Sequence, residues 1–393
     1  MNDTYSILRR PEPALSPSPF DSSTGRAGLE SAGPPQLEVA QLSKGDLLDV
    51  ARDPGVRAVA PIMPTRLIAP VAEQSDVTAA SGPTWGVQAV GADTSARTGA
   101  GVSVSILDTG IDSDHPAFAG VTIVQEDFTG SGNGDNQGHG THCAGTVFGR
   151  DVDGTRIGVA PGVEHALIGK VLGDDGSGDS AMLFNGMQWA VREGAHVLSM
   201  SLGFDFPGLV ARLVEDGWPA DLATSAALEG YRANLRMFDA IMEVVASQAA
   251  FGHGTIVTAA AGNESRRNVN PDHEIAVSLP AAADGVVSVG ALAQDAAGLV
   301  VAPFSNTFPH VAAPGVDVIS ARAGGGLRSL SGTSMATPHV AGVTALWWEE
   351  VLASALPGTA GTVTSRILAH SDLGALAPGV DVADRGVGLV RAP

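Results

Sequence analysis

The chain of 393 residues is short of cysteine, lysine, aromatic residues and long apolar runs. Its single cysteine, Cys143, excludes an internal disulfide, so the fold does not depend on an oxidising compartment. Only Lys44 and Lys170 are lysines, and the formal net charge of −20 argues against a nucleic acid or an anionic membrane as partner. No segment approaches the roughly 20 consecutive apolar residues that a transmembrane helix requires. What the chain does have, 44% hydrophobic residues and 50 glycines, suits a packed α/β core with many tight turns.

The amino-terminal residues do not have the pattern of a secretory signal peptide. Arg9 and Arg10 are followed by prolines and serines, where a signal peptide would have its apolar core. As the sequence stands, this predicts a cytoplasmic protein. A true start lying upstream would instead make the protein extracellular.

Three regions are expected along the chain. Residues 1–35 are rich in Pro, Ser and Gly and are predicted to be disordered. Residues 36–79 contain a strand, a capping box at Ser43 and Asp46 ahead of a short helix, and a returning strand. Residues 80–393 form the third and largest region.

In the third region, strands alternate with helices, which predicts an α/β fold with a mostly parallel central sheet and helices on both faces. The expected strands are 102–107, 166–172, 196–200, 255–259 and 286–289, and the expected helices are 141–148, 181–193, 235–248 and 334–352. Asp108, Ser201 and Asn263 each follow closely on the carboxyl end of a strand. Open α/β sheets bind their ligands at that edge, so these residues are expected in one cleft.

The segment 332–339, Gly-Thr-Ser-Met-Ala-Thr-Pro-His, presents a serine at the start of an apolar helix. The first turn of a helix has backbone N–H groups without intrahelical partners, which can stabilise an oxyanion beside Ser334. Pro338 is consistent with a helix start, because proline is tolerated in the first turn. The alternative is an ordinary helix cap.

Two further segments carry polar residues with catalytic potential. Asp108 ends an apolar strand, and His139 lies between glycines just before a helix of small residues. Separately, each has a simpler interpretation, Asp108 as a turn former and His139 as a loop residue. Together with Ser334, in the order Asp, His, Ser, they indicate nucleophilic catalysis.

These three segments resemble the signature motifs of the subtilisin-like serine peptidases, the subtilases, over residues 85–392. The resemblance implies that Ser334 attacks the peptide carbonyl, His139 transfers the proton and Asp108 orients the imidazole. It also implies that the side-chain amide of Asn263 and the N–H of Ser334 form the oxyanion hole. The alternative for Asn263 is a turn residue.

The resemblance further implies two strands that bind substrate as an added strand. They are Ser201-Leu202-Gly203 on the S1 side and Gly176-Ser177-Gly178 opposite. Phe204 stands where the family often has a second glycine and is expected to narrow the S1 entrance. Asp174, Asp175 and Asp179 flank the second strand, and we expect them either to favour basic substrate residues or to be solvated turn acids.

Two segments lie outside the catalytic motifs. Residues 36–79 resemble the later half of a subtilase propeptide, which implies a folding chaperone and temporary inhibitor, cleaved between residues 67 and 83. The alternative is an extension that is never removed. Residues 204–230 form an insertion that is either a rim over the cleft or a separate surface element.

No metal or cofactor is expected. The His and Cys residues lack zinc spacing. Ala117 stands where the common calcium site of the family has an acid, so that site is unsupported, although a different calcium site is left open. Cys143 is expected to be a buried apolar residue beneath His139.

The sequence therefore predicts a serine endopeptidase that works through an acyl-enzyme and is made as a proenzyme. Its expected partners are a peptide or protein substrate and its own propeptide. Two alternatives stay open: a dedicated processing peptidase or peptide transferase, and a catalytically silent peptide-binding module.

Overall fold

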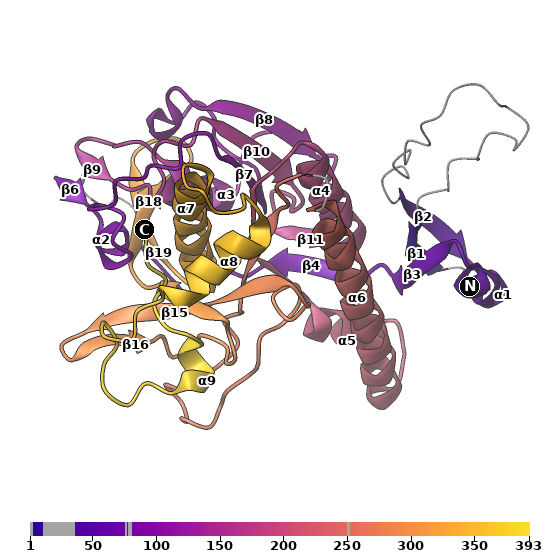
Figure 1. The fold of residues 1–393 in the computed structure, drawn as a ribbon. Helices are drawn as coiled ribbons and strands as arrows, with labels where there is room; N and C mark the ends of the chain where they lie inside the picture. Colours follow the sequence, from indigo (N-terminus) through magenta and orange to yellow (C-terminus); the bar gives the residue numbers. More distant parts are fainter. Residues whose placement is uncertain (1–2, 11–35, 75–76, 78–80, 250–251) are drawn as a thin grey trace, which may run out of the picture.

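A computed structural model describes residues 3–10, 36–74, 77, 81–249 and 252–393. In this part of the chain the central sheet has eight strands in the order β16-β15-β14-β12-β7-β10-β8, with β17 also paired to β15 (Figure 1). The strands are β7 Ser103–Asp108, β8 Thr122–Asp127, β10 His165–Lys170, β12 Val197–Met200, β14 Ile256–Ala260, β15 Val286–Asp295, β16 Gly298–Val301 and β17 Val311–Pro314. All neighbours are parallel except β15 and β16. The mostly parallel sheet is confirmed.

Helices cover both faces of this sheet because its strands are apolar on both sides. On β7, Val104 and Ile106 belong to a core with helices α3 (His139–Phe148) and α7 (Thr333–Leu352). Leu107 joins the opposite core, which contains side chains of α4 (Ser180–Arg192) and α6 (Ala220–Gln248). Burial on both faces is typical of parallel sheets between helices. The polar residues therefore collect at the strand ends.

Smaller elements surround the sheet. One three-stranded sheet has the order β11-β4-β13, with β11 Ser177–Asp179, β4 Pro64–Leu67 and β13 Leu202–Phe204. A second three-stranded sheet has the order β18-β19-β5, with β18 Val318–Ala321, β19 Leu327–Ser331 and β5 Ala72–Gln74. A two-stranded sheet pairs β6 Gly82–Pro83 with β9 Thr155–Arg156. The remaining helices are α2 Trp85–Ala89, a 3₁₀ turn at Pro116–Phe118, α5 Phe206–Glu215, α8 Ala360–Ala369 and α9 Val382–Arg385.

The amino-terminal sheet corrects one prediction. Its order is β2-β1-β3, with β1 Asp3–Arg9, β2 Gln36–Leu42 and β3 Val56–Pro61. The prediction of disorder is wrong for residues 3–9, because β1 is the central strand and buries Ile7 and Leu8. A composition averaged over 1–35 hid this short apolar strand. Residues 1–2 and 11–35 of that region lie outside the described residues.

One predicted helix has the expected cap, and another differs from the structure. The capping box of α1 (Lys44–Arg52) is present, with the Ser43 hydroxyl accepting from the Asp46 N–H and the Asp46 carboxylate accepting from the Ser43 N–H. The helix expected at 235–248, however, begins at Ala220 and includes the end of the predicted insertion. Within the described residues, no helix is both long enough and apolar enough to cross a membrane.

Candidate active site

Asp108 and His139 form a buried pair at the carboxyl edge of the sheet. Asp108 is the last residue of β7, and His139 is the first residue of α3. The imidazole Nδ1 lies 2.8 Å and 3.0 Å from the two carboxylate oxygens. Gly138, with φ of 88°, has the left-handed conformation that glycine readily adopts and that turns the chain into α3. The two contacts hold the Nδ1 edge of the imidazole against the Asp108 carboxylate.

The charge of Asp108 controls the protonation of His139. Burial disfavours the imidazolium, but the nearby carboxylate outweighs it and holds the pKa of His139 well above its usual value. The other ring nitrogen, Nε2, is buried without a hydrogen-bond partner among the described residues. A buried, unpartnered nitrogen on a carboxylate-oriented imidazole is suited to exchanging a proton with a substrate or nucleophile.

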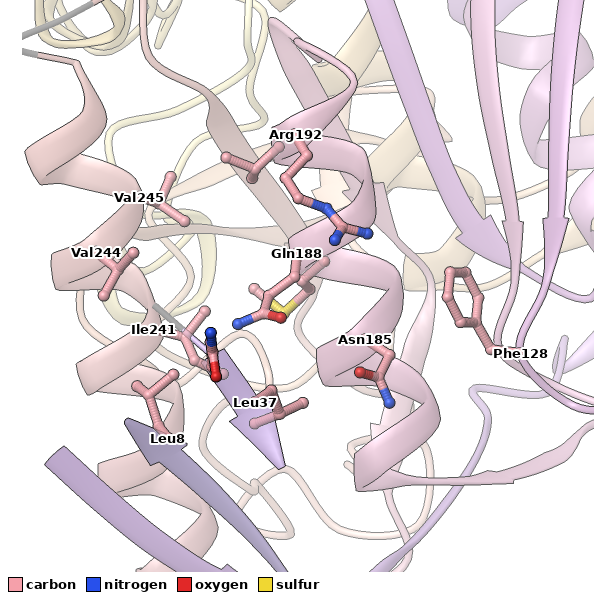
Figure 2. Close-up of a pocket in the computed structure, with 12 residues that line it drawn as sticks. Leu8, Leu37, Phe128, Asn185, Gln188, Arg192, Ile241, Val244 and Val245 are labelled. Atoms are coloured by element: carbon pink, nitrogen blue, oxygen red, sulfur yellow. The ribbon is translucent and has the colours of Figure 1, made fainter. Parts of the chain in front are cut away.

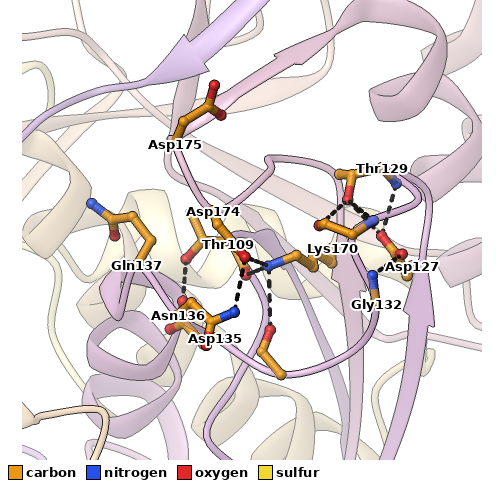
Figure 3. Close-up of polar contacts among 12 residues, drawn as sticks. Thr109, Asp127, Thr129, Gly132, Asp135, Asn136, Gln137, Lys170, Asp174 and Asp175 are labelled. Atoms are coloured by element: carbon orange, nitrogen blue, oxygen red, sulfur yellow. Dashed lines mark hydrogen bonds and ion pairs between the residues drawn. The ribbon is translucent and has the colours of Figure 1, made fainter.

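A polar network joins the residues next to the pair, and its contacts among Thr109, Asp135 and Lys170 are drawn in Figure 3. The Asp135 carboxylate accepts from the Thr109 hydroxyl at 2.8 Å and from the Thr141 hydroxyl at 2.6 Å. The buried Lys170 ammonium donates to the Thr109 carbonyl oxygen at 2.7 Å and to Asp174 at 2.8 Å. These bonds connect the end of β7 to the start of α3.

Sequence reasoning missed Asp135 and Lys170. The available signal was the rarity of lysine, because a lone lysine in an apolar strand needs buried acceptors. In the parallel pairing of β10 with β7, Lys170 lies directly opposite Asp108.

Ser334 lies in the first turn of α7 and is fully buried. Its hydroxyl donates to the carbonyl oxygen of Ile68 at 3.0 Å, and the carbonyl oxygen of Ser201 is 3.4 Å away. The hydroxyl is therefore directed toward residue 68 of the same chain instead of His139. One side chain connects the two residues: Cys143 Sγ lies 3.7 Å from His139 Nδ1 and 3.5 Å from the carbonyl oxygen of Ser334.

Pro338 lies deeper in α7 than predicted. The helix begins at Thr333, so Pro338 is within the helix, beyond the first turn. Because proline has no N–H, the carbonyl of Ser334 lacks its usual donor four residues later. That carbonyl instead accepts from the Ser201 hydroxyl at 3.1 Å and from the Cys143 thiol. The proline thus ties the backbone of Ser334 to Ser201 and Cys143.

Asn263 follows β14, and its side-chain amide is held in one orientation. Its oxygen accepts from the backbone N–H and the hydroxyl of Thr333, both at 2.9 Å. Its NH₂ group therefore faces the cleft, where it donates to the carbonyl oxygen of Ala69 at 3.0 Å. Thr333, which sets this orientation, is another residue that sequence reasoning missed.

A segment of the chain itself fills the cleft. Strand β4 pairs antiparallel with both β11 and β13, so Arg66 lies between Ser177 and Gly203. The Leu67 N–H donates to the carbonyl oxygen of Gly176 at 2.8 Å. The remaining predicted substrate-binding residues also line this sheet: Gly178 pairs with Thr65, Leu202 pairs with Leu67, and Ser201 lies just before β13.

Other predicted features near the cleft have different roles. The ring of Phe204 packs edge-on against Phe238 in the core. The acids beside β11 are engaged locally: Asp174 with Lys170, Asp175 with the Ser177 hydroxyl, and Asp179 as the cap of α4.

Among the described residues, one group of three potential metal ligands lies close together. It comprises Asp108, His139 and Cys143, whose ligand atoms lie within 4.8 Å of one another. Burial raises the pKa of the Cys143 thiol, which disfavours the thiolate that a metal would need. Near Ala117, the Arg150 guanidinium donates to the carbonyl oxygens of Phe148 and Val163, so an arginine supplies the positive charge there.

Comparison with known proteins decides the family. The model of the subtilase family matches residues 99–376. The chain belongs to the subtilase family. This subtilase is a serine endopeptidase, which acts on peptide or protein substrates.

Three relatives illustrate the similarity. An "Intracellular serine protease" of Paenibacillus polymyxa is 35% identical over 256 residues, 63% of this chain and 67% of the relative. A "Thermostable alkaline protease" of Halalkalibacterium halodurans is 32% identical over 78% of this chain and 71% of its own length. The "Subtilisin-like serine protease Pen c 1" of Penicillium citrinum is 32% identical over 78% of this chain and 68% of its own length.

Proposed function

We propose that this endopeptidase uses Ser334 as nucleophile, His139 as general base and acid, and Asp108 as the group that orients and stabilises the imidazole. In the first step, His139 Nε2 takes the hydroxyl proton as Ser334 Oγ bonds to the substrate carbonyl carbon. The same imidazole then gives that proton to the leaving amine as the peptide bond breaks. Water repeats the sequence on the acyl-enzyme. The carboxylate pair with Nδ1 at 2.8 Å and the unpartnered Nε2 support these roles.

The oxyanion that forms in both steps would accept hydrogen bonds from Asn263 Nδ2 and the Ser334 N–H. Asn263 is suited to this because Thr333 fixes the amide before substrate arrives. A donor that is already oriented needs no rearrangement when charge develops, which is the main source of its catalytic value.

We further propose that substrates bind as β4 does, as a middle strand between β11 and β13. Backbone hydrogen bonds to Gly176 and pairing with Gly203 would hold any sequence in this way. In that register the carbonyl of Ile68 lies at Ser334, so Ile68 occupies the position of the residue before the scissile bond, the P1 residue.

The segment 64–71 would then be a self-inhibitor that the enzyme does not cut efficiently in this arrangement. The Ser334 hydroxyl meets the carbonyl of Ile68, whereas the Asn263 amide meets the carbonyl of Ala69, the next residue. The proposed nucleophile and the proposed oxyanion donor therefore contact two different carbonyls. Cleavage requires both of them at the same carbonyl. Pro70 has no N–H, and the following Val71 N–H donates to Ser331 at 2.7 Å.

The amino-terminal sheet would keep this segment in place. The Asn234 amide donates to the Pro61 carbonyl at 2.9 Å, and Arg57 pairs with Glu243 of α6. The Met63 N–H donates to the Ser180 hydroxyl at 3.1 Å, and the Met63 carbonyl accepts from the Ser180 N–H at 2.9 Å. The contact between sheet and helices is not fully packed. A cavity of about 510 Å³ remains at this contact, lined by Leu8 and Leu37 on one side and by side chains of α4 and α6 on the other (Figure 2). Incomplete packing weakens an interface, which suits an inhibitor that must be released.

The proposed partners are therefore peptide or protein substrates and the chain's own segment 36–79. For its location we propose the cytoplasm, in line with the name of the Paenibacillus relative. Fractionation of the native host with an antibody to the chain tests this.

Labelling with a fluorophosphonate, combined with intact mass analysis, tests the mechanism. The freshly purified full chain should react slowly, because Ser334 is buried beneath residues 64–71. As cleavage between residues 67 and 83 proceeds, labelling should increase, and peptide mapping should place the probe on Ser334.

The Ser334→Ala variant is the matched control and should stay uncut and unlabelled. A wild-type chain that has lost its amino-terminal segment and still does not react would contradict the assignment of Ser334. Equal processing of the Ser334→Ala variant under the same conditions would instead exclude self-cleavage.

A further inference from the structure

One side chain of the self-bound segment has a charged partner beyond the backbone contacts. Arg66 Nη1 lies 3.2 Å from the carboxylate of Asp205. The backbone of Arg66 pairs with Gly203, two residues before Asp205, so the ion pair lies beside the β4–β13 pairing. Arg66 is the third residue before the proposed scissile bond if Ile68 is the first.

Asp205 is held in place by the fold. Its carboxylate accepts from the Gly208 N–H at 3.0 Å and so caps α5, and its own N–H donates to the Pro64 carbonyl at 3.0 Å. Its side chain is 22% exposed, compared with 48% for Arg66. A carboxylate fixed by a helix cap loses little freedom on binding a cation, so more of the attraction contributes to affinity.

The surroundings also favour a cation. A neighbouring cavity of about 790 Å³, which Pro64 lines but Arg66 and Asp205 do not, is lined by the acids Asp174, Asp175, Asp179 and Asp216, with Arg212 as the one opposing charge among its lining residues. The acids beside β11 are engaged by their own loop or helix, as described above. Asp205 is the acid with an ion pair to the bound segment.

We propose that Asp205 forms a specificity subsite for arginine at the third position before the scissile bond of substrates. This inference rests on the proposed function, because it takes residues 64–68 as the stand-in for a bound substrate. The arginine would leave the groove between β11 and β13 and meet the Asp205 carboxylate at the start of α5.

Peptide anilides of the form Pro-Thr-Xaa-Leu-Zaa-anilide test the subsite on the matured enzyme. Xaa is arginine, glutamine or glutamate, and Zaa is whichever residue a peptide library shows is cleaved fastest. Release of the anilide fixes the register. The ratio of kcat/KM for arginine over glutamine should be about fivefold, the value of a favourable partly exposed ion pair, with glutamate slower still. Raising the ionic strength to about 1 M should reduce the ratio.

The variant Asp205→Asn removes the charge but keeps an oxygen that caps α5, since asparagine and aspartate cap helices equally well. It should reduce the arginine preference, measured as the ratio of kcat/KM for arginine over glutamine, to near one. Asp216→Asn, at the other end of α5, is the matched control and should keep the preference. If Asp205→Asn does not fold, Asp205→Ser replaces it, because serine also caps a helix. The kcat/KM ratios of the wild-type enzyme on the three peptides test the arginine preference without any variant.

The outcomes separate this inference from the proposed function. Efficient cleavage of all three peptides with equal kcat/KM overturns the subsite and leaves the triad assignment standing. An arginine preference that survives in Asp205→Asn overturns the role of Asp205. Failure to cleave any peptide, with no labelling of Ser334, overturns the proposed function and this inference together.

Discussion

Asn263→Ala should affect turnover far more than it affects binding of the segment 64–71, the proposed self-inhibitor. The substitution removes the NH₂ group that Thr333 holds toward the cleft. Loss of one oxyanion donor lowers kcat by roughly 100- to 1,000-fold, or about 2.7–4 kcal/mol of transition-state stabilisation. KM should change little, because the ground-state carbonyl carries much less charge than the oxyanion.

The same amide holds the segment 64–71 through the neutral carbonyl of Ala69 at 3.0 Å. A hydrogen bond between neutral groups contributes about 1 kcal/mol, so inhibition by a synthetic peptide of residues 62–74 should weaken only about fivefold. Measuring kcat, KM and the inhibition constant on one preparation gives both effects. Thr333→Val keeps the backbone donor to Asn263 but removes the hydroxyl, and it should lower kcat less than Asn263→Ala does.

Two results would refute this reasoning. A kcat within about threefold of wild type would mean that Asn263 does not contact the developing oxyanion. A large rise in KM with unchanged kcat would mean that the amide binds the ground state and the transition state equally well. Circular dichroism and the thermal midpoint of the variant serve as the folding control.

Three further predictions concern protonation and ion binding. Burial lowers the pKa of His139, but the carboxylate of Asp108 outweighs burial and holds this pKa well above its usual value. The imidazole therefore stays protonated, and inactive as a base, as the pH rises past about 6.5, the usual pKa of histidine. The pH profile of kcat/KM should therefore rise on the alkaline side, and Asp108→Asn should shift that limb to lower pH while reducing activity by about 10⁴-fold. Burial lowers the pKa of His339 to about 4, so the unfolded chain binds the extra proton between about pH 4 and 6.5. Stability should be complete above that window and fall by up to about 3 kcal/mol as pH drops through it, and urea unfolding should show a weaker pH dependence in His339→Gln. A chelator should leave the thermal midpoint of the wild type unchanged, whereas Arg150→Met should lower stability by about 1–3 kcal/mol because two carbonyls lose their donor. A fall of several degrees with chelator alone would contradict this last expectation.

Local sequence predicted the elements whose residue pattern matches the surroundings that the folded protein gives them. The strand ending at Asp108 reads as a continuous apolar run because both of its faces are buried, and the capping box at Ser43 and Asp46 is a contact between residues three positions apart. The family motifs identified Asp108 and His139, which the structure joins at 2.8 Å.

Other elements depended on partners that are distant in sequence. Strand β1 is short and lies in a region of low hydrophobicity, so only its place between β2 and β3 accounts for it. The continuous helix α6 crosses the boundary of the predicted insertion because its buried side chains contact β3 and α5. Pro338 was expected at the helix start, yet it lies inside α7, where neighbouring side chains satisfy the freed carbonyl.

The sequence by itself determined the chemical groups of the site and the order in which strands and helices follow one another, since both depend on residue type and short-range periodicity. The tertiary structure decided what occupies the cleft. Strand β4 adds to β11 and β13 through backbone hydrogen bonds, which any residue but proline can donate and which therefore leave no residue pattern to read. The direction of the Ser334 hydroxyl and the pairing of Arg66 with Asp205 follow from that strand addition, so only the folded chain contains them.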